Sequence, residues 1–172
     1  MNKATVDMSE QPSSTSLDTP LYYLENALTL VRWVKRIHAD LLNEHETTQI
    51  DAFLNAPQQA QALLIRMIMR RQSIFRFDQL SHYSEITLDL KEVVAQLVSR
   101  GLVTMSPSID LPHCFKILNK EELWCLQDQH TNLGLKKSSR KQDLIAALKS
   151  VELNSRPLSE WLGNTECSLE VN

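Results

Sequence analysis

The chain has 172 residues and a formal net charge of −3, and 42% of its residues are hydrophobic while 23% are charged. These fractions are typical of globular proteins and exclude a wholly disordered chain. Only three glycines are present, at Gly101, Gly134 and Gly163, which excludes Gly-rich phosphate loops and disfavours turn-rich β-sandwiches and barrels. We therefore expect a mainly helical protein.

No membrane span is predicted, because no apolar run reaches about 18 residues. No signal peptide is predicted either, because the N-terminus lacks a basic segment followed by an apolar one. The cysteines, Cys114, Cys125 and Cys167, form no C-x-x-C pair and indicate reduced packing residues of a cytoplasmic protein. His113 and His130 could be combined with the first two cysteines, but the spacing fits no common zinc site. No metal ligand is therefore expected.

The first half of the chain predicts three helices after a disordered tail at residues 1–17, which is polar and lacks periodicity. The segment Asp18-Thr19-Pro20 is typical of a helix start, and apolar residues at helical spacing follow it. Asn43 with Glu46 predicts a capping box for a second helix, and Pro57 starts a third. The buried stripe of that third helix is predicted to consist of Ala60, Leu63, Leu64, Met67 and Ile68.

The next segment has the element order of a winged helix-turn-helix. Residues 74–77 predict a short strand, and residues 80–86 have room for at most a two-turn helix. A helix over about 88–99 should end at Gly101 in the left-handed conformation, followed by a strand at 102–105. The helix at 88–99 is then the recognition element. Its exposed charges have both signs, which indicates contacts with a nucleic-acid backbone or a protein rather than with bases.

A second helix–turn–helix follows. Asn119 with Glu122 predicts another capping box, and a turn at Gly134 leads to a helix capped by Ser138 or Ser139. A basic cluster lies at the start of this helix, where backbone N–H groups and the helix dipole also favour phosphate. The cluster consists of Lys136, Lys137, Arg140 and Lys141.

Another basic stretch lies within residues 60–77, which contain four arginines and no acid: Arg66, Arg70, Arg71 and Arg76. Of these, Arg66 is expected to pair with a neighbouring acid. Basic segments in an acidic chain indicate an anion-binding face that binds the nucleic-acid backbone with strong salt dependence. The alternative is a solvated helix face in a helical protein-interaction module with no nucleic-acid role.

Two sets of residues carry a family resemblance. Residues 134–145 resemble a SAP motif, a small DNA-binding helix–turn–helix, with a serine in place of its usual second loop glycine. The segments 21–24, 63–71 and 88–103 are similar, in order and spacing, to the N-terminal region of Fanconi-associated nucleases, the VRR-NUC phosphodiesterases. The resemblance covers about residues 20–150.

This resemblance implies a mainly α fold, in which a helical N-terminal region with a winged helix-turn-helix and a small β wing precedes a SAP-like helix-turn-helix. The expected organisation is a disordered tail at 1–17, a helical and winged-helix domain at 18–107, a SAP-like motif at 108–150, and the start of a truncated helical region or a tail at 151–172. Residues 156–162 are expected to begin a helix whose apolar partners are missing.

The resemblance also implies a DNA-binding module of a structure-specific nuclease of the phosphodiesterase I type. Such enzymes act as 5′-flap endonucleases and 5′-exonucleases in interstrand-crosslink repair, so the protein would associate with the nucleoid. The expected partner is flap, nicked or branched duplex DNA, and self-association or a downstream nuclease domain are further partners considered. Four residues occupy positions where the family meets the DNA backbone: Tyr22, Arg70, Arg71 and Tyr83.

No catalytic residue is expected in this chain. A nuclease of this class needs carboxylates around a metal ion, and only Asp78 followed by Asp89 and Lys91 approximates that pattern. Asp89 serves better as a helix cap. The resemblance assigns the Mg²⁺ or Mn²⁺ of the family to a C-terminal VRR-NUC domain, so no cofactor is expected within these residues.

Overall fold

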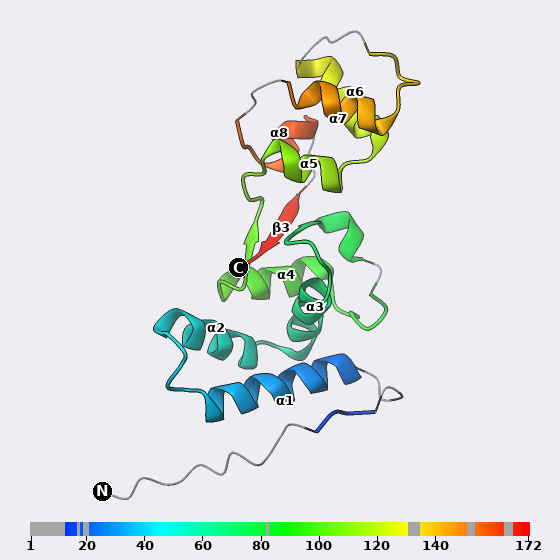
Figure 1. Ribbon diagram of the computed structural model, residues 1–172. Coiled ribbons are helices and arrows are strands. Elements are labelled where there is room, and N and C mark those ends of the chain that lie inside the picture. Colours follow the sequence, from blue (N-terminus) through cyan, green and yellow to red (C-terminus); the bar gives the residue numbers. More distant parts are fainter. Residues whose placement is uncertain are drawn as a thin grey trace, which may run out of the picture. The chain divides into compact units, whose positions relative to one another are not determined.

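The computed structural model describes residues 13–16, 18, 21–81, 83–130, 135–150, 154–163 and 167–172. The protein is mainly helical with a small sheet, which confirms the predicted fold class (Figure 1). None of the helices in the described ranges is long and apolar enough to cross a membrane. The elements are α1 (Tyr22–Ile37), α2 (Glu44–Leu54), α3 (Gln58–Ile68), β1 (Ile74–Arg76), the 3-10 helix η1 (Phe77–Leu80), α4 (Leu90–Ser99), β2 (Val103–Met105), α5 (Leu111–Ile117), α6 (Lys120–His130), α7 (Lys141–Leu148), α8 (Leu158–Leu162) and β3 (Ser168–Val171).

The chain folds into two compact units, and each unit is built from more than one segment of the sequence. The first unit takes its described residues from Met1–Arg71, Tyr83–Val103 and Asn172, and the second from Gln72–His82 and Thr104–Val171. These bounds differ from the predicted domains, because β1 pairs with the C-terminal strand β3 and so joins the second unit.

The first unit contains α1, α2, α3 and α4. The capping box of α2 is confirmed: the Glu46 N–H donates to Asn43 Oδ1 at 2.8 Å, and the Asn43 N–H donates to Glu46 Oε2 at 2.9 Å. Helix α1 begins at Tyr22 rather than at residues 18–20, after Leu21 in the left-handed conformation with φ 61°; Thr19 and Pro20 lie outside the described residues. The predicted stripe of α3 is buried except for Ile68, which is 56% exposed although the neighbouring Met67 is fully buried.

Helix α4 is set by local signals at both of its ends. The Lys91 N–H donates to Asp89 Oδ1 at 3.0 Å, which makes Asp89 the N-cap. After the helix, Gly101 has φ 68°, as predicted, and β2 follows. Residues 80–86 were predicted to hold at most a two-turn helix; η1 ends at Leu80, and the described residues after it form turns.

Replacing Gly101 with alanine should lower the free energy of unfolding by about 1 kcal/mol. A Cβ at this position meets no atom within 4 Å, so the cost comes from the left-handed backbone alone. Urea unfolding followed by circular dichroism measures it. Gly101→Asn is the matched control and should lose less, because asparagine tolerates the left-handed region; equal losses for both variants would contradict this reason.

The second unit packs helices α5 to α8 beside the sheet, whose strand order is β1-β3-β2. Strand β1 pairs antiparallel with β3, with Phe75 opposite Leu169. Trp161 of α8 is fully buried, and its Nε1 donates to the Ile109 carbonyl at 2.9 Å. The core of this unit consists of Ile74, Ile109, Leu111, Cys114, Phe115, Leu118, Leu123, Leu126, Leu144, Leu148, Leu158 and Trp161.

The C-terminal segment therefore differs from the expectation for 151–172. The apolar side chains of α8 are not without partners: Leu158 and Trp161 are buried in the core built by α5, α6 and α7. Strand β3 was not expected, and neither was α5, although Asp110 caps α5 by accepting the His113 N–H at 2.9 Å. The predicted tail at 1–17 lies outside the described residues, apart from 13–16.

Candidate nucleic-acid interface

Two of the predicted contact residues, Arg70 and Arg71, directly follow the C-terminal end of α3 in the first unit. Both side chains are exposed. The Arg70 guanidinium lies over the ring of Tyr83, with its Cζ 5.2 Å from the ring centroid. Arg70 is thus an exposed cation that rests on an aromatic surface.

Arg66, one helical turn earlier, does not join this exposed pair. Its Nε lies 2.7 Å from Glu85 Oε1, and its Cζ lies 4.0 Å from the centroid of the Tyr23 ring. The Tyr23 hydroxyl also donates to Glu85, at 2.9 Å. The expectation that Arg66 pairs with an acid is therefore confirmed.

The charge states of this triad follow from burial and hydrogen bonding. Burial, followed by the hydrogen bond to Glu85, raises the pKa of Tyr23 to about 12, so its hydroxyl stays protonated. Burial works against ionisation of Glu85, but hydrogen bonds from the backbone, Arg66 and Tyr23 outweigh it and lower the pKa of this carboxyl. At neutral pH the triad therefore holds one half-buried ion pair and offers no surplus charge.

The two predicted tyrosines occupy different positions around the triad. Tyr22 is half-buried on α1, and its ring meets that of Tyr23 edge-on at a centroid distance of 6.0 Å. Tyr83 is half-buried, and its hydroxyl oxygen is buried without a hydrogen-bond partner among the described residues. The structure thus brings Tyr22, Tyr83 and Arg70 into one connected group through Tyr23 and Arg66.

The second predicted cluster lies at the start of α7 in the second unit. Lys136, Lys137 and Arg140 are exposed, whereas Lys141 is half-buried. The cap of α7 differs from the prediction of Ser138 or Ser139: Arg140 is the N-cap residue, and its N–H donates to Asp143 Oδ2 at 3.1 Å. The predicted turn at Gly134 lies outside the described residues.

Two members of this cluster have partners within the unit. Lys137 Nζ lies 5.7 Å from the centroid of the Trp124 ring, and Lys141 Nζ donates to the Leu118 carbonyl at 2.7 Å. Lys141 thereby satisfies a carbonyl at the end of α5, which gives it a structural role that the sequence did not indicate. Lys136 and Arg140 are the members best placed to meet an external anion.

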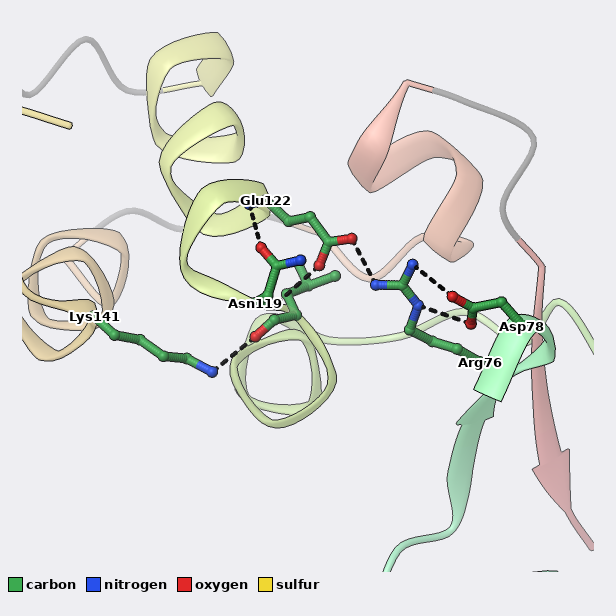
Figure 2. A network of polar contacts seen from close by, with 6 residues as sticks. Arg76, Asp78, Asn119, Glu122 and Lys141 are labelled. Carbon is green, nitrogen blue, oxygen red and sulfur yellow. Dashed lines mark hydrogen bonds and ion pairs between the residues drawn. The ribbon is translucent and has the colours of Figure 1, made fainter. Parts of the chain in front are cut away.

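Arg76, from the basic stretch at 60–77, is a buried structural residue. Figure 2 shows its guanidinium between Glu122, 2.6 Å from Nη1, and Asp78, whose two oxygens lie 3.3 Å from Nε and Nη2. Glu122 also closes the capping box of α6, by accepting the Asn119 N–H at 2.8 Å. This network joins the end of β1 to the start of α6, and it removes Arg76 from the exposed cations.

Several of the residues considered for metal binding or catalysis have structural roles. No group of three or more His, Cys, Asp or Glu residues that could hold a metal occurs in the part of the chain that the structure describes. Burial, then the charge of Asp110, raises the pKa of the Cys114 thiol to about 12, so it is not a nucleophile. Asp78 pairs with Arg76, and Asp89 caps α4.

Comparisons with known proteins agree on one family. The family model "FAN1, HTH domain" matches residues 21–104. The Fanconi-associated nuclease 1 homolog of Pseudomonas aeruginosa is 37% identical over 149 residues, which are 87% of this chain and 26% of the relative. Fanconi-associated nuclease 1 of Danio rerio is 32% identical over 131 residues, which are 74% of this chain and 13% of the relative.

Solved structures show the same similarity. A crystal structure of paFAN1 bound to DNA with a 2-nucleotide 5′ flap and a gap matches with a TM-score of 0.80 at 35% identity, covering 92% of this chain and 28% of that one. The complex with a 1-nucleotide flap matches with a TM-score of 0.77 at 35% identity, over 90% of this chain and 28% of that one. The chain thus spans about a quarter of the length of the Pseudomonas aeruginosa relative and of paFAN1, and 13% of the Danio rerio relative.

Proposed function

Because the chain belongs to the Fanconi-associated nuclease family, we propose that it is the DNA-binding module of a structure-specific repair nuclease. The observation that carries this proposal is the presence of exposed cations at one end of a helix in each unit. Arg70 and Arg71 follow α3, and Lys136 and Arg140 precede α7. The similarity to proteins that bind 5′-flap DNA supports the same conclusion.

The module holds the DNA by its backbone and does not read its sequence. We interpret the order α3, β1, α4, β2 as a winged helix-turn-helix and α6 with α7 as a SAP-like unit. The exposed charges Asp89, Lys91 and Glu92 at the start of α4 sum to a negative value, which is unsuited to the major groove of DNA. Arginines and lysines at helix ends instead favour phosphate, which every sequence presents alike.

We propose that the cleavage reaction is carried out outside these residues. We assign Mg²⁺- or Mn²⁺-dependent cleavage of 5′ flaps, and its role in interstrand-crosslink repair, to a VRR-NUC domain outside these residues. The described residues hold no carboxylate cluster suited to such a metal. The module then presents branched, nicked or flapped duplex to that domain, and the protein is nucleoid-associated while bound.

A salt titration tests the proposal. Fluorescence anisotropy with labelled 5′-flap, nicked and intact duplexes should show an affinity that falls steeply and linearly on a log–log plot against salt, and equally for unrelated sequences. Replacing Arg70 and Arg71 with glutamine should weaken binding about 100-fold, since each charged hydrogen bond to phosphate is worth about tenfold.

Arg32→Gln is the matched control, because Arg32 is an exposed arginine of the same unit that lies on α1 outside the proposed interface. It should bind within about twofold of the unchanged chain, as expected for a surface charge remote from the ligand. A chain that shifts no DNA at low salt would refute the proposed function.

A further inference from the structure

Aromatic rings and guanidinium groups alternate in the first unit, in a series that runs from the core to the surface. Tyr23 is 6% exposed, Arg66 lies over its ring, Tyr83 follows at 5.7 Å from the Arg66 Cζ, and Arg70 lies at 5.2 Å from the centre of Tyr83. Each ring attracts a cation through the negative charge of its π face. The last member of the series, Arg70, is exposed and belongs to the proposed interface.

The inner part of this series is fixed by polar contacts. Glu85 Oε1 accepts hydrogen bonds from Arg66 Nε at 2.7 Å and from the Tyr23 hydroxyl at 2.9 Å. The Glu85 side chain is only 19% exposed. A half-buried carboxylate with two such donors resists rearrangement, because breaking one contact leaves a partly desolvated charge with one hydrogen bond fewer. Arg66 therefore presents its guanidinium to Tyr83 in a defined orientation.

Tyr83 acts through its ring rather than through its hydroxyl. The hydroxyl oxygen is buried and has no hydrogen-bond partner among the described residues, so it is withdrawn from solvent and from an external phosphate. The ring, in contrast, contacts the guanidinium groups of Arg66 and Arg70. The family resemblance suggested that Tyr83 meets the DNA backbone directly, and this geometry argues for a different role.

We propose that Tyr83 is a positioning residue that orients Arg70 for the DNA backbone and is itself held by the triad of Tyr23, Arg66 and Glu85. The inference rests on the proposed function, because it deepens the role of the α3 end in DNA binding. A long exposed arginine loses rotamer freedom when it binds phosphate, and an aromatic surface beneath it removes part of that loss in advance. Arg71, the next residue, provides the internal comparison.

A double-mutant cycle on 5′-flap DNA binding tests the proposal. Tyr83→Leu removes the ring and should weaken binding about three- to fivefold, the equivalent of one exposed cation–π contact. In an Arg70→Gln background the same change should have no further effect, whereas in an Arg71→Gln background it should retain its full effect. Tyr83→Phe keeps the ring and should restore the affinity lost in Tyr83→Leu.

Two results would overturn the proposal. If Tyr83→Phe weakens binding as much as Tyr83→Leu, the hydroxyl itself contacts DNA. If the effects of Tyr83→Leu and Arg70→Gln multiply, the ring does not act through Arg70. Failure of the unchanged chain to bind 5′-flap DNA would refute the proposed function instead, so the two failures are distinguishable.

A measurement on the unchanged chain covers the case in which Tyr83→Leu fails to fold. The Arg70 Nε–H resonance in a ¹H–¹⁵N spectrum should lie upfield of that of Arg71, because the Tyr83 ring current acts on Arg70. Tyr83→Phe should preserve this upfield shift. Coincident resonances of the two arginines would contradict the contact and, with it, the positioning role.

Discussion

Simultaneous replacement of four exposed cations by glutamate should abolish binding to 5′-flap DNA, with a loss above about 1,000-fold in affinity. The four residues are Arg70, Arg71, Lys136 and Arg140, all of them exposed. In the proposed interface, each change removes one phosphate contact and adds a charge that repels the DNA backbone. The slope of log affinity against log salt should fall by about 3 to 4, since each phosphate contact contributes about 0.9.

The choice of residues follows from the structure rather than from the count of charges. Lys141 is left unchanged because its ammonium group satisfies the Leu118 carbonyl, and its replacement would disturb the end of α5. Lys137 is retained because it lies against the Trp124 ring. Circular dichroism should therefore show an unchanged helical signal in the variant, which separates loss of binding from loss of fold.

A second set of glutamate substitutions gives the same net charge and serves as the control. It consists of Arg32, Arg36, Lys116 and Lys149, exposed residues on or beside α1, α5 and α7. These substitutions should weaken binding by less than about tenfold, through long-range repulsion alone, which salt screens. Equal losses in the two sets would mean that net charge, and not the two helix-end clusters, determines affinity.

Local signals in the sequence were sufficient to predict much of the first unit. The capping box at Asn43, the cap at Asp89 and the left-handed Gly101 each depend on residues within one turn of the position concerned. Such features bound helices reliably because the orphan N–H and C=O groups at a helix end must be satisfied nearby. The capping box formed by Asn119 and Glu122 was predictable for the same reason.

Features that depend on distant partners were not predictable. Strand β3 exists because Leu169 pairs opposite Phe75 of β1, and helices α4 to α8 lie between these two strands in the sequence. The strand is short and carries no turn signal of its own. Likewise, Leu158 and Trp161 looked unpartnered because their contacts are spread over residues 109–148.

In the candidate site too, the sequence revealed the local clustering of charge but not the distant partners of individual residues. The sequence grouped Arg66, Arg70, Arg71 and Arg76 by charge, but two of them pair with acids outside that stretch. Glu85 pairs with Arg66, and Arg76 pairs with the nearby Asp78 and the distant Glu122. Alternation in β1 could not reveal Arg76 as buried, because an arginine in a short strand normally faces solvent. Of these four arginines, only the exposed pair Arg70 and Arg71 then remains for the proposed contact with DNA.

Trp161→Ala should lower the free energy of unfolding of the second unit by about 4 kcal/mol. The side chain is fully buried, its Nε1 donates to Ile109, and the Arg156 guanidinium lies 4.6 Å from its ring centroid. Truncation leaves a cavity in the core of α5, α6 and α7 and removes one of two hydrogen bonds to the Ile109 carbonyl, which still accepts the Arg156 N–H at 3.2 Å. Urea unfolding monitored by tryptophan fluorescence of the remaining Trp33 and Trp124 measures the loss.

Two comparisons separate the causes of this loss. Trp161→Phe fills most of the cavity but cannot donate to Ile109, so it should lose only about 1–2 kcal/mol. Trp33→Ala removes a half-buried tryptophan from α1 of the first unit and should leave the Trp124 transition in place. Unfolding of Trp161→Ala at the same urea concentration as the unchanged chain would contradict this prediction. In that case α8 would not stabilise the core that supports Lys136 and Arg140.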